Sequence, residues 1–148
     1  MEGEPLGRAL GLTAKAMRER FDQQLAAVGS SLVSWLILRA ASDNPGISQR
    51  QLAALLGIEG PTLTHHLDRV AADGLVDRAR HPADRRVMTV SLTAAGKHHL
   101  GRVTAHAERL DAELRSLLSE RELRTTLRVL NRLRDHYTKE TDAQHPGH

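Results

Sequence analysis

The stretch from Ser48 to Gly96 constrains the fold more than any other part of the chain, because its pattern predicts two short helices followed by a β-hairpin. Ser48 and Gln51 have the S-x-x-Q spacing in which side chains satisfy the free backbone N–H groups at a helix N-terminus. An apolar stripe at helical spacing follows, made of Leu52, Leu55 and Leu56. Gly57 is a typical helix stop, so the first helix should end there.

The second helix of this stretch should run from Pro61, whose fixed φ suits a first helical turn, to about Asp73. Its buried face should consist of Leu63, Leu67, Val70 and Ala71, and its outward face of Thr62, Thr64, His65, His66, Asp68 and Arg69. Short hydrogen-bonding side chains at the start of a helix suit the reading of base edges in a major groove. We interpret this helix as a DNA reader that makes contacts through Thr62, Thr64, His65, His66 and Arg69. The alternative is an ordinary solvated helix face.

Two extended runs come next, Leu75 to Arg80 and Arg86 to Leu92, and the second alternates like a half-buried strand. Between them, residues 81–85 form an exposed loop that contains a proline. The candidate DNA contacts of this loop are Asp84, Arg85 and Arg86. Arginines on a protruding hairpin can enter a narrow A·T minor groove. The fold class predicted is mainly α with a small β-hairpin wing, a winged helix-turn-helix.

The wing motif resembles that of the multiple antibiotic resistance regulator (MarR) family of bacterial transcription regulators. In that family the wing carries D-x-R and is followed by L-T-x-x-G, and here the matching residues are Asp84, Arg86, Leu92, Thr93 and Gly96. The resemblance implies that Arg86 is the minor-groove arginine, that Asp84 orients it, and that the helix from Pro61 reads the major groove. It also implies a repressor that leaves DNA when a small aromatic acid binds in a cleft partly walled by Trp35. Trp35 as an ordinary core residue is the alternative.

The rest of the chain predicts amphipathic helices on both sides of this head. The organisation expected is an N-terminal dimerisation helix over 1–30, the DNA-binding region over 31–97, dimerisation helices over 98–140 and a frayed tail over 141–148, within one structural domain. The apolar stripes expected outside the head comprise Leu6, Leu10, Met17, Phe21, Leu25 and Val28, then Leu123, Leu127, Leu130, Leu133 and Tyr137. A two-fold homodimer would cover them and would bind pseudo-palindromic double-stranded DNA. A self-contained monomeric bundle is the alternative.

Composition narrows the class further. The net charge of +3, with 21 Lys and Arg against 18 Asp and Glu, would not by itself identify a nucleic-acid binder. The sequence has no cysteine, which excludes disulfides, thiolate metal sites and thiol redox switches. No apolar run approaches the ~18–20 residues that a membrane span needs, and no leader pattern opens the chain. We therefore expect a cytoplasmic protein, associated with the nucleoid when bound, with no membrane partner.

Three other functions compete with this interpretation. An enzyme is not expected, because the sequence lacks nucleophile motifs and glycine-rich phosphate loops, and no cofactor is expected. A zinc-sensing regulator of the same fold would use His98, His99, His106 and Glu108, which lie near one another on the predicted helix after the wing. Surface histidines explain that pattern equally well. An architectural DNA binder without a regulatory ligand is a third alternative.

Overall fold

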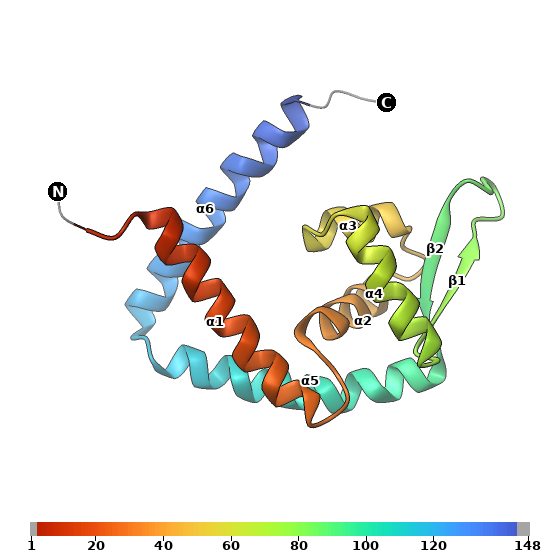
Figure 1. Ribbon diagram of the computed structural model, residues 1–148, viewed down its shortest axis with the longest axis horizontal. Coiled ribbons are helices and arrows are strands. Elements are labelled where there is room, and N and C mark those ends of the chain that lie inside the picture. The colour runs from red at the N-terminus through yellow and green to blue at the C-terminus, as the bar shows by residue number, and fades with distance from the viewer. Residues whose placement is uncertain (1–2, 145–148) are drawn as a thin grey trace. The chain divides into compact units, whose positions relative to one another are not determined.

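The computed structural model describes residues 3–144, which form six α-helices and one two-stranded antiparallel sheet (Figure 1). The elements are α1 (Leu6–Ala26), α2 (Leu32–Asp43), α3 (Gln49–Leu56), α4 (Gly60–Ala72), β1 (Val76–Arg80), β2 (Met88–Leu92), α5 (Ala94–Ser116) and α6 (Glu120–Gln144). The winged helix-turn-helix predicted from the sequence is confirmed. The chain forms two compact units that divide between Glu108 and Arg109, inside α5. No helix of residues 3–144 is long and apolar enough to cross a membrane.

The caps of α3 are those the sequence predicts. The Ser48 hydroxyl accepts a hydrogen bond from the Gln51 backbone N–H at 3.1 Å, and the Gln51 side chain accepts one from the Ser48 N–H at 3.0 Å. Gly57 ends the helix with a φ of 64°, a left-handed conformation that costs glycine little. The tight connection to α4 follows, and Pro61 lies in the first turn of that helix. Local capping therefore determines where both helices of the motif begin and end.

The core of the first unit lies around α2, which the sequence shows to be apolar nearly all round. Ile37 and Leu38 are fully buried there. They pack with residues from α3, α4 and the hairpin, among them Leu52, Leu63, Leu67, Val70, Val76 and Val90. Because each of these elements contributes aliphatic side chains to one cluster, the DNA head is held as a unit around α2.

One residue of the predicted stripe on α3 is not buried. Leu55 is 59% exposed, whereas Leu52 is buried and Leu56 is half-buried. The core-facing side of α3 is centred on Leu52, Ala53 and Leu56, and Leu55 lies about 100° away from that centre around the helix. Leu55 therefore belongs to the apolar stripe of the sequence but lies outside the core of the structure.

The hairpin pairs Val76 with Leu92 at its base and Arg80 with Met88 near its tip. Its second strand is also tied to the start of the helix-turn-helix, since the Val90 N–H donates to the Ile47 carbonyl at 2.9 Å. Val90 is fully buried. The wing is thus anchored at its base by the core and extends beyond it at the tip.

The L-T-x-x-G segment joins the hairpin to α5. The Thr93 hydroxyl donates to the Gly74 carbonyl at 2.6 Å and accepts from the Gly96 N–H at 2.9 Å. The Thr93 N–H donates to the Leu75 carbonyl at 3.1 Å. A Cβ on Gly96 would lie 2.0 Å from the Leu75 oxygen, so only glycine allows α5 to approach the turn between α4 and β1 this closely.

The two terminal helices carry apolar side chains that their own units leave exposed. On α1 only Leu25 is buried, and Phe21 is half-buried. The exposed large apolar residues of α1 are Leu6, Leu10, Leu12 and Met17. In the second unit, Ser119 and Glu122 cap α6 as predicted, through a 2.8 Å bond from the Ser119 N–H to the Glu122 carboxylate. The exposed apolar residues of α6 include Leu127, Leu130 and Tyr137.

The last part of α6 differs from the sequence expectation. The helix continues to Gln144, so residues 141–144 are helical where a frayed tail was expected to begin. Residues 145–148 of that expected tail lie outside the described residues.

Candidate DNA-binding site

The polar face of α4 points toward solvent because the opposite, apolar face is buried in the core. Leu63, Leu67 and Val70 are buried in the core, which fixes the rotation of the helix about its axis. The side chains that consequently point outward are Thr62, Thr64, His65, Asp68 and Arg69, all exposed, with His66 half-buried beside them. The Thr64 hydroxyl donates its hydrogen to the Gly60 carbonyl at 3.0 Å, so its oxygen remains available as an acceptor.

The two adjacent histidines of α4 contact each other. The ring centroids of His65 and His66 are 5.9 Å apart in an edge-to-face arrangement. Burial lowers the pKa of His66, and the charges of His65 and Arg69 act in the same direction while that of Asp22 opposes them. His66 is therefore held toward its neutral form, in which one ring nitrogen donates and the other accepts a hydrogen bond.

An ion pair joins α4 to the wing. Arg78 on β1 places its Nη1 atom 2.7 Å from the Asp68 Oδ1 atom on the outward face of α4. Asp68 would otherwise present an unpaired negative charge on a surface proposed to meet phosphates. The sequence did not indicate Arg78 as a site residue, because no local pattern connects two charged residues in different elements. The one signal in the sequence was the acidic side chain of Asp68 among the basic and hydroxyl side chains on the outward face of α4.

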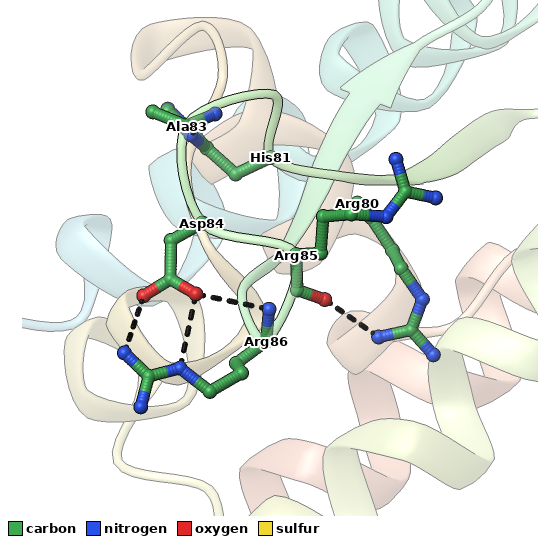
Figure 2. A network of polar contacts seen from close by, with 6 residues as sticks. All are labelled: Arg80, His81, Ala83, Asp84, Arg85 and Arg86. Carbon is green, nitrogen blue, oxygen red and sulfur yellow. Dashed lines mark hydrogen bonds and ion pairs between the residues drawn. The ribbon is translucent and has the colours of Figure 1, made fainter.

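The wing tip holds the Asp84 and Arg86 side chains together (Figure 2). The Arg86 Nε atom donates to Asp84 Oδ1 and its Nη2 atom to Oδ2, both at 3.1 Å, and the Arg86 N–H also donates to Oδ1 at 3.1 Å. These bonds lower the pKa of Asp84 and raise the pKa of Arg86. The Arg86 side chain is nevertheless 91% exposed. A charged, oriented guanidinium therefore stands at the tip of the hairpin.

Further polar contacts shape the loop around this pair, as Figure 2 shows. The Arg80 Nη1 atom donates to the Arg85 carbonyl at 2.8 Å, and the Ala83 N–H donates to His81 Nδ1 at 3.0 Å. Arg85 itself is exposed. Arg80 was not among the predicted site residues, although its position at the end of β1 adds a third arginine near the wing tip, beside Arg85 and Arg86.

Trp35 links α2 to α5. Its indole is half-buried against the core cluster, and the indole N–H donates to the Thr104 hydroxyl at 3.2 Å. This contact gives Trp35 a structural role whether or not a ligand binds beside it. Its place in an effector cleft stays a prediction.

The histidines of the metal-sensing alternative are not brought together. Among residues 3–144, no group of three or more His, Asp or Glu side chains is placed to hold a metal ion. His98 is exposed and His99 is buried, because neighbours on a helix point about 100° apart. His106 lies about 10 Å further along α5 than His99, and Glu108 is exposed beyond it. The residues of the zinc-sensing alternative are therefore not gathered into one set of ligands within the described part of the chain.

Comparison with known proteins agrees with this architecture. A model of the MarR family matches residues 28–87. The transcriptional repressor CouR, solved bound to a 23-mer DNA duplex, is 29% identical with a TM-score of 0.80, over 90% of this chain and 99% of that chain. Two further structures show the same fold at lower identity. MepR of S. aureus, solved as a DNA complex, is 20% identical with a TM-score of 0.83, over 90% of this chain and 99% of that chain.

PcaV of Streptomyces coelicolor, solved in complex with its natural ligand, is 21% identical with a TM-score of 0.77, over 91% of this chain and 98% of that chain. The family model falls on α2, α3, α4 and the wing up to Val87, the elements that carry the polar helix face and the Asp84–Arg86 pair. The resemblance inferred from the wing motif is thus confirmed by a MarR-family model that matches the DNA-reading part of this chain and by the similarity to CouR.

Proposed function

We propose that this protein is a sequence-specific regulator of transcription that binds double-stranded DNA as a homodimer. The observation that carries the proposal is the pairing of Arg86 with Asp84 at an exposed wing tip on the same head as the polar face of α4. A helix that shows hydrogen-bonding side chains and a hairpin that shows an oriented arginine suit the major and minor grooves respectively. The similarity to CouR, a repressor solved on DNA, supports the same function here.

Each part of the head has its own role in this proposal. Thr62, Thr64, His65 and His66 lie on the face of α4 that would meet base edges, and Arg69 would contact base or phosphate. Arg86 would enter the minor groove, with Arg85 beside it on the loop. Asp84 would contact no DNA and would act by holding Arg86. The function is binding, and no catalytic role is assigned to any of these residues.

A homodimer follows from the terminal helices. The exposed apolar side chains of α1 and those of α6 lie outside the head, where water contact is unfavourable. A second copy covering them would relate two reading helices by a two-fold axis. The operator would then be pseudo-palindromic, with half-sites about 34–36 Å apart. Residues 1–30 and 98–140 accordingly have the dimerisation role, and residues 31–97 the DNA-binding role.

Repression relieved by a small molecule is the mode of regulation we propose. The related PcaV was solved with a natural ligand, which shows that this fold can hold one. A small aromatic acid bound near Trp35 would release DNA if it preferred an arrangement of the helices that cannot bind DNA. As a regulator of transcription, the protein would act in the cytoplasm at the nucleoid.

Selection of bound duplexes from a random pool tests the proposal directly. The expected product is a two-fold symmetric site bound in the nanomolar range at moderate salt. Fluorescence anisotropy with the selected duplex, a scrambled duplex and a single strand then measures specificity. Enrichment of no site, or equal binding of the single strand, would refute the proposed function. Variants of Arg86 distinguish contact through the wing from binding elsewhere.

A further inference from the structure

His99 is the most unusual polar side chain in the described part of the chain. It is 8% exposed, and among residues 3–139 its Nε2 atom is the one buried side-chain nitrogen or oxygen without a hydrogen-bond partner. A buried polar group left without a partner destabilises the folded state. Neither the DNA-binding surface nor the core requires a histidine at this place, and an aliphatic residue would avoid the cost.

The contact with Arg102 determines the protonation state of His99. The Arg102 Nη2 atom lies 3.2 Å from the His99 Nδ1 atom. A guanidinium nitrogen can only donate, so Nδ1 must be the unprotonated acceptor and the ring hydrogen must be on Nε2. A second proton, added at Nδ1, would set two N–H groups against each other and two positive charges side by side. The arrangement seen in the structure is therefore available only to neutral His99.

Charged groups on α5 itself and at the end of α4 act on the His99 ring. Burial lowers the pKa of His99 most, and the positive charge of Arg102 on the same helix adds to the effect. His98 acts in the same direction, whereas Asp73, at the end of α4, opposes both. The surroundings as a whole thus favour the neutral ring.

His99 lies where α5 holds the DNA head together. Gly96, one turn earlier on the same face of α5, meets the Leu75 carbonyl at the closest approach described above. Thr93 is bonded to Gly74 in the same turn. That turn, between α4 and β1, connects the reading helix to the wing. A change at His99 would therefore act on the part of the fold that sets both DNA-contacting elements.

We propose that His99 is a proton sensor, and that protonation of its ring loosens α5 from the turn between α4 and β1 and so weakens DNA binding. The effect on stability rests on the structure alone, whereas the effect on DNA rests on the proposed function. Since the ordinary pKa is 6.5 and the folded state resists protonation, the unfolded chain takes up the proton first as the pH falls. The contribution of neutral His99 to stability is thus complete above about pH 6.5 and is lost progressively below it.

The substitution His99→Gln tests this proposal, because glutamine can accept from Arg102 and cannot titrate. His98→Gln, on the exposed neighbour, is the matched control. Urea unfolding and operator anisotropy are measured for all three proteins at about pH 7.5 and about pH 5.5. On acidification, the parent and His98→Gln should lose affinity relative to His99→Gln by less than about tenfold, which is the limit for one proton with the ordinary pKa of 6.5 between these two pH values. Their urea midpoints should also fall more than that of His99→Gln.

His65 and His66 are present in all three proteins, so any contribution they make to the pH dependence of DNA binding or unfolding cancels when the proteins are compared. Identical pH profiles for the parent and His99→Gln, in unfolding and in DNA binding, would overturn the proposal. If no protein binds DNA at any pH, the proposed function fails, and the unfolding data still decide whether His99 senses protons.

A second variant keeps the test decisive if His99→Gln does not fold. Arg102→Gln removes the guanidinium that blocks Nδ1. The titration of His99, followed by long-range ¹H–¹⁵N NMR of the full chain, should then move to higher pH. The stability lost on acidification should become smaller, because the pKa of the folded state approaches that of the unfolded chain. An unchanged titration would show that Arg102 does not control this ring, contrary to the proposal.

Discussion

The Arg78 guanidinium lies 2.7 Å from the Asp68 carboxylate and so joins the wing to the outward face of the reading helix. Arg78→Gln should weaken operator binding more than Asp68→Asn does, because it leaves an unpaired negative charge facing phosphate. The double variant should recover part of that loss. The pair is partly exposed, so each change should alter the free energy of unfolding by no more than about 1 kcal/mol. Arg39→Gln, which breaks the exposed Arg39–Asp43 pair on α2, is the control and should leave operator affinity unchanged.

Gly96→Ala should strongly destabilise the fold. Its Cβ would meet a backbone oxygen at 2.0 Å, and backbone cannot move aside as a flexible side chain can. We expect the free energy of unfolding, measured in urea, to fall by about 1–3 kcal/mol or more. Gly101→Ala on the same helix is the control, because no atom lies within 4 Å of its Cβ. That change should stabilise the protein by about 0.5–1 kcal/mol. Equal effects at both sites would contradict the close approach.

Arg86→Ala should reduce operator affinity about tenfold, comparable with the loss of one good contact. The slope of log affinity against log salt should become shallower by about one, since one cation leaves the interface. Stability should not change, because the side chain is exposed. Arg86→Lys should recover the salt slope but not the full affinity, as lysine cannot bind Asp84 through two nitrogens. Arg39→Ala on α2, where a change should leave operator affinity unaltered, serves as the control for loss of an exposed arginine. Parental affinity for Arg86→Ala would rule out the wing contact.

The double substitution Leu127→Gln and Leu130→Gln should weaken self-association. These residues are 43% and 42% exposed on α6, and a partner surface would bury them. Sedimentation equilibrium should show a shift from dimer toward monomer, accompanied by loss of operator binding. Leu55→Gln is the control, since Leu55 is the same residue type and is 59% exposed but lies on α3 in the DNA head. A dimer of undiminished affinity would place the interface elsewhere.

An effector bound near Trp35 should change the fluorescence of this one tryptophan. Titration with salicylate-like anions should then give a saturable signal. Linkage requires operator DNA to weaken ligand binding by the factor by which ligand weakens DNA binding. Thr104→Val, which removes the hydrogen-bond partner of the indole, should alter the spectrum of the free protein and serves as a reference. Equal ligand affinities with and without DNA would show that the bound anion is not the effector.

Local signals in the sequence were sufficient for the helix-turn-helix and the hairpin. The reciprocal bonds of Ser48 and Gln51 involve residues three apart, and the left-handed conformation of Gly57 depends on that residue alone. The same holds for the Asp84–Arg86 pair, whose members are two residues apart. Such features depend on the chain immediately around them, and a single sequence contains that information.

Contacts between distant elements were not predictable in the same way. The Arg78–Asp68 pair depends on how β1 leaves α4, and the bond from Thr93 to Gly74 joins two residues that are 19 positions apart in the chain. The burial of His99 and the exposure of Leu55 depend on the rotation of α5 and α3 against their neighbours. A helical pattern tells which residues share a face, but packing decides how far around the helix that face extends.

The bonds between Asp84 and Arg86 also bear on how the protein meets DNA. A free arginine side chain samples many rotamers, and fixing it in a groove costs conformational entropy at the moment of association. Because Asp84 restricts Arg86 in the unbound protein, much of that ordering is complete before the encounter. Calorimetry should therefore find a less favourable entropy of operator binding for Asp84→Ala than for the parent, even where the contact made by Arg86 is the same. Asp84 repels phosphate, yet it would assist DNA binding because it reduces the rotamer freedom of Arg86 before DNA is bound.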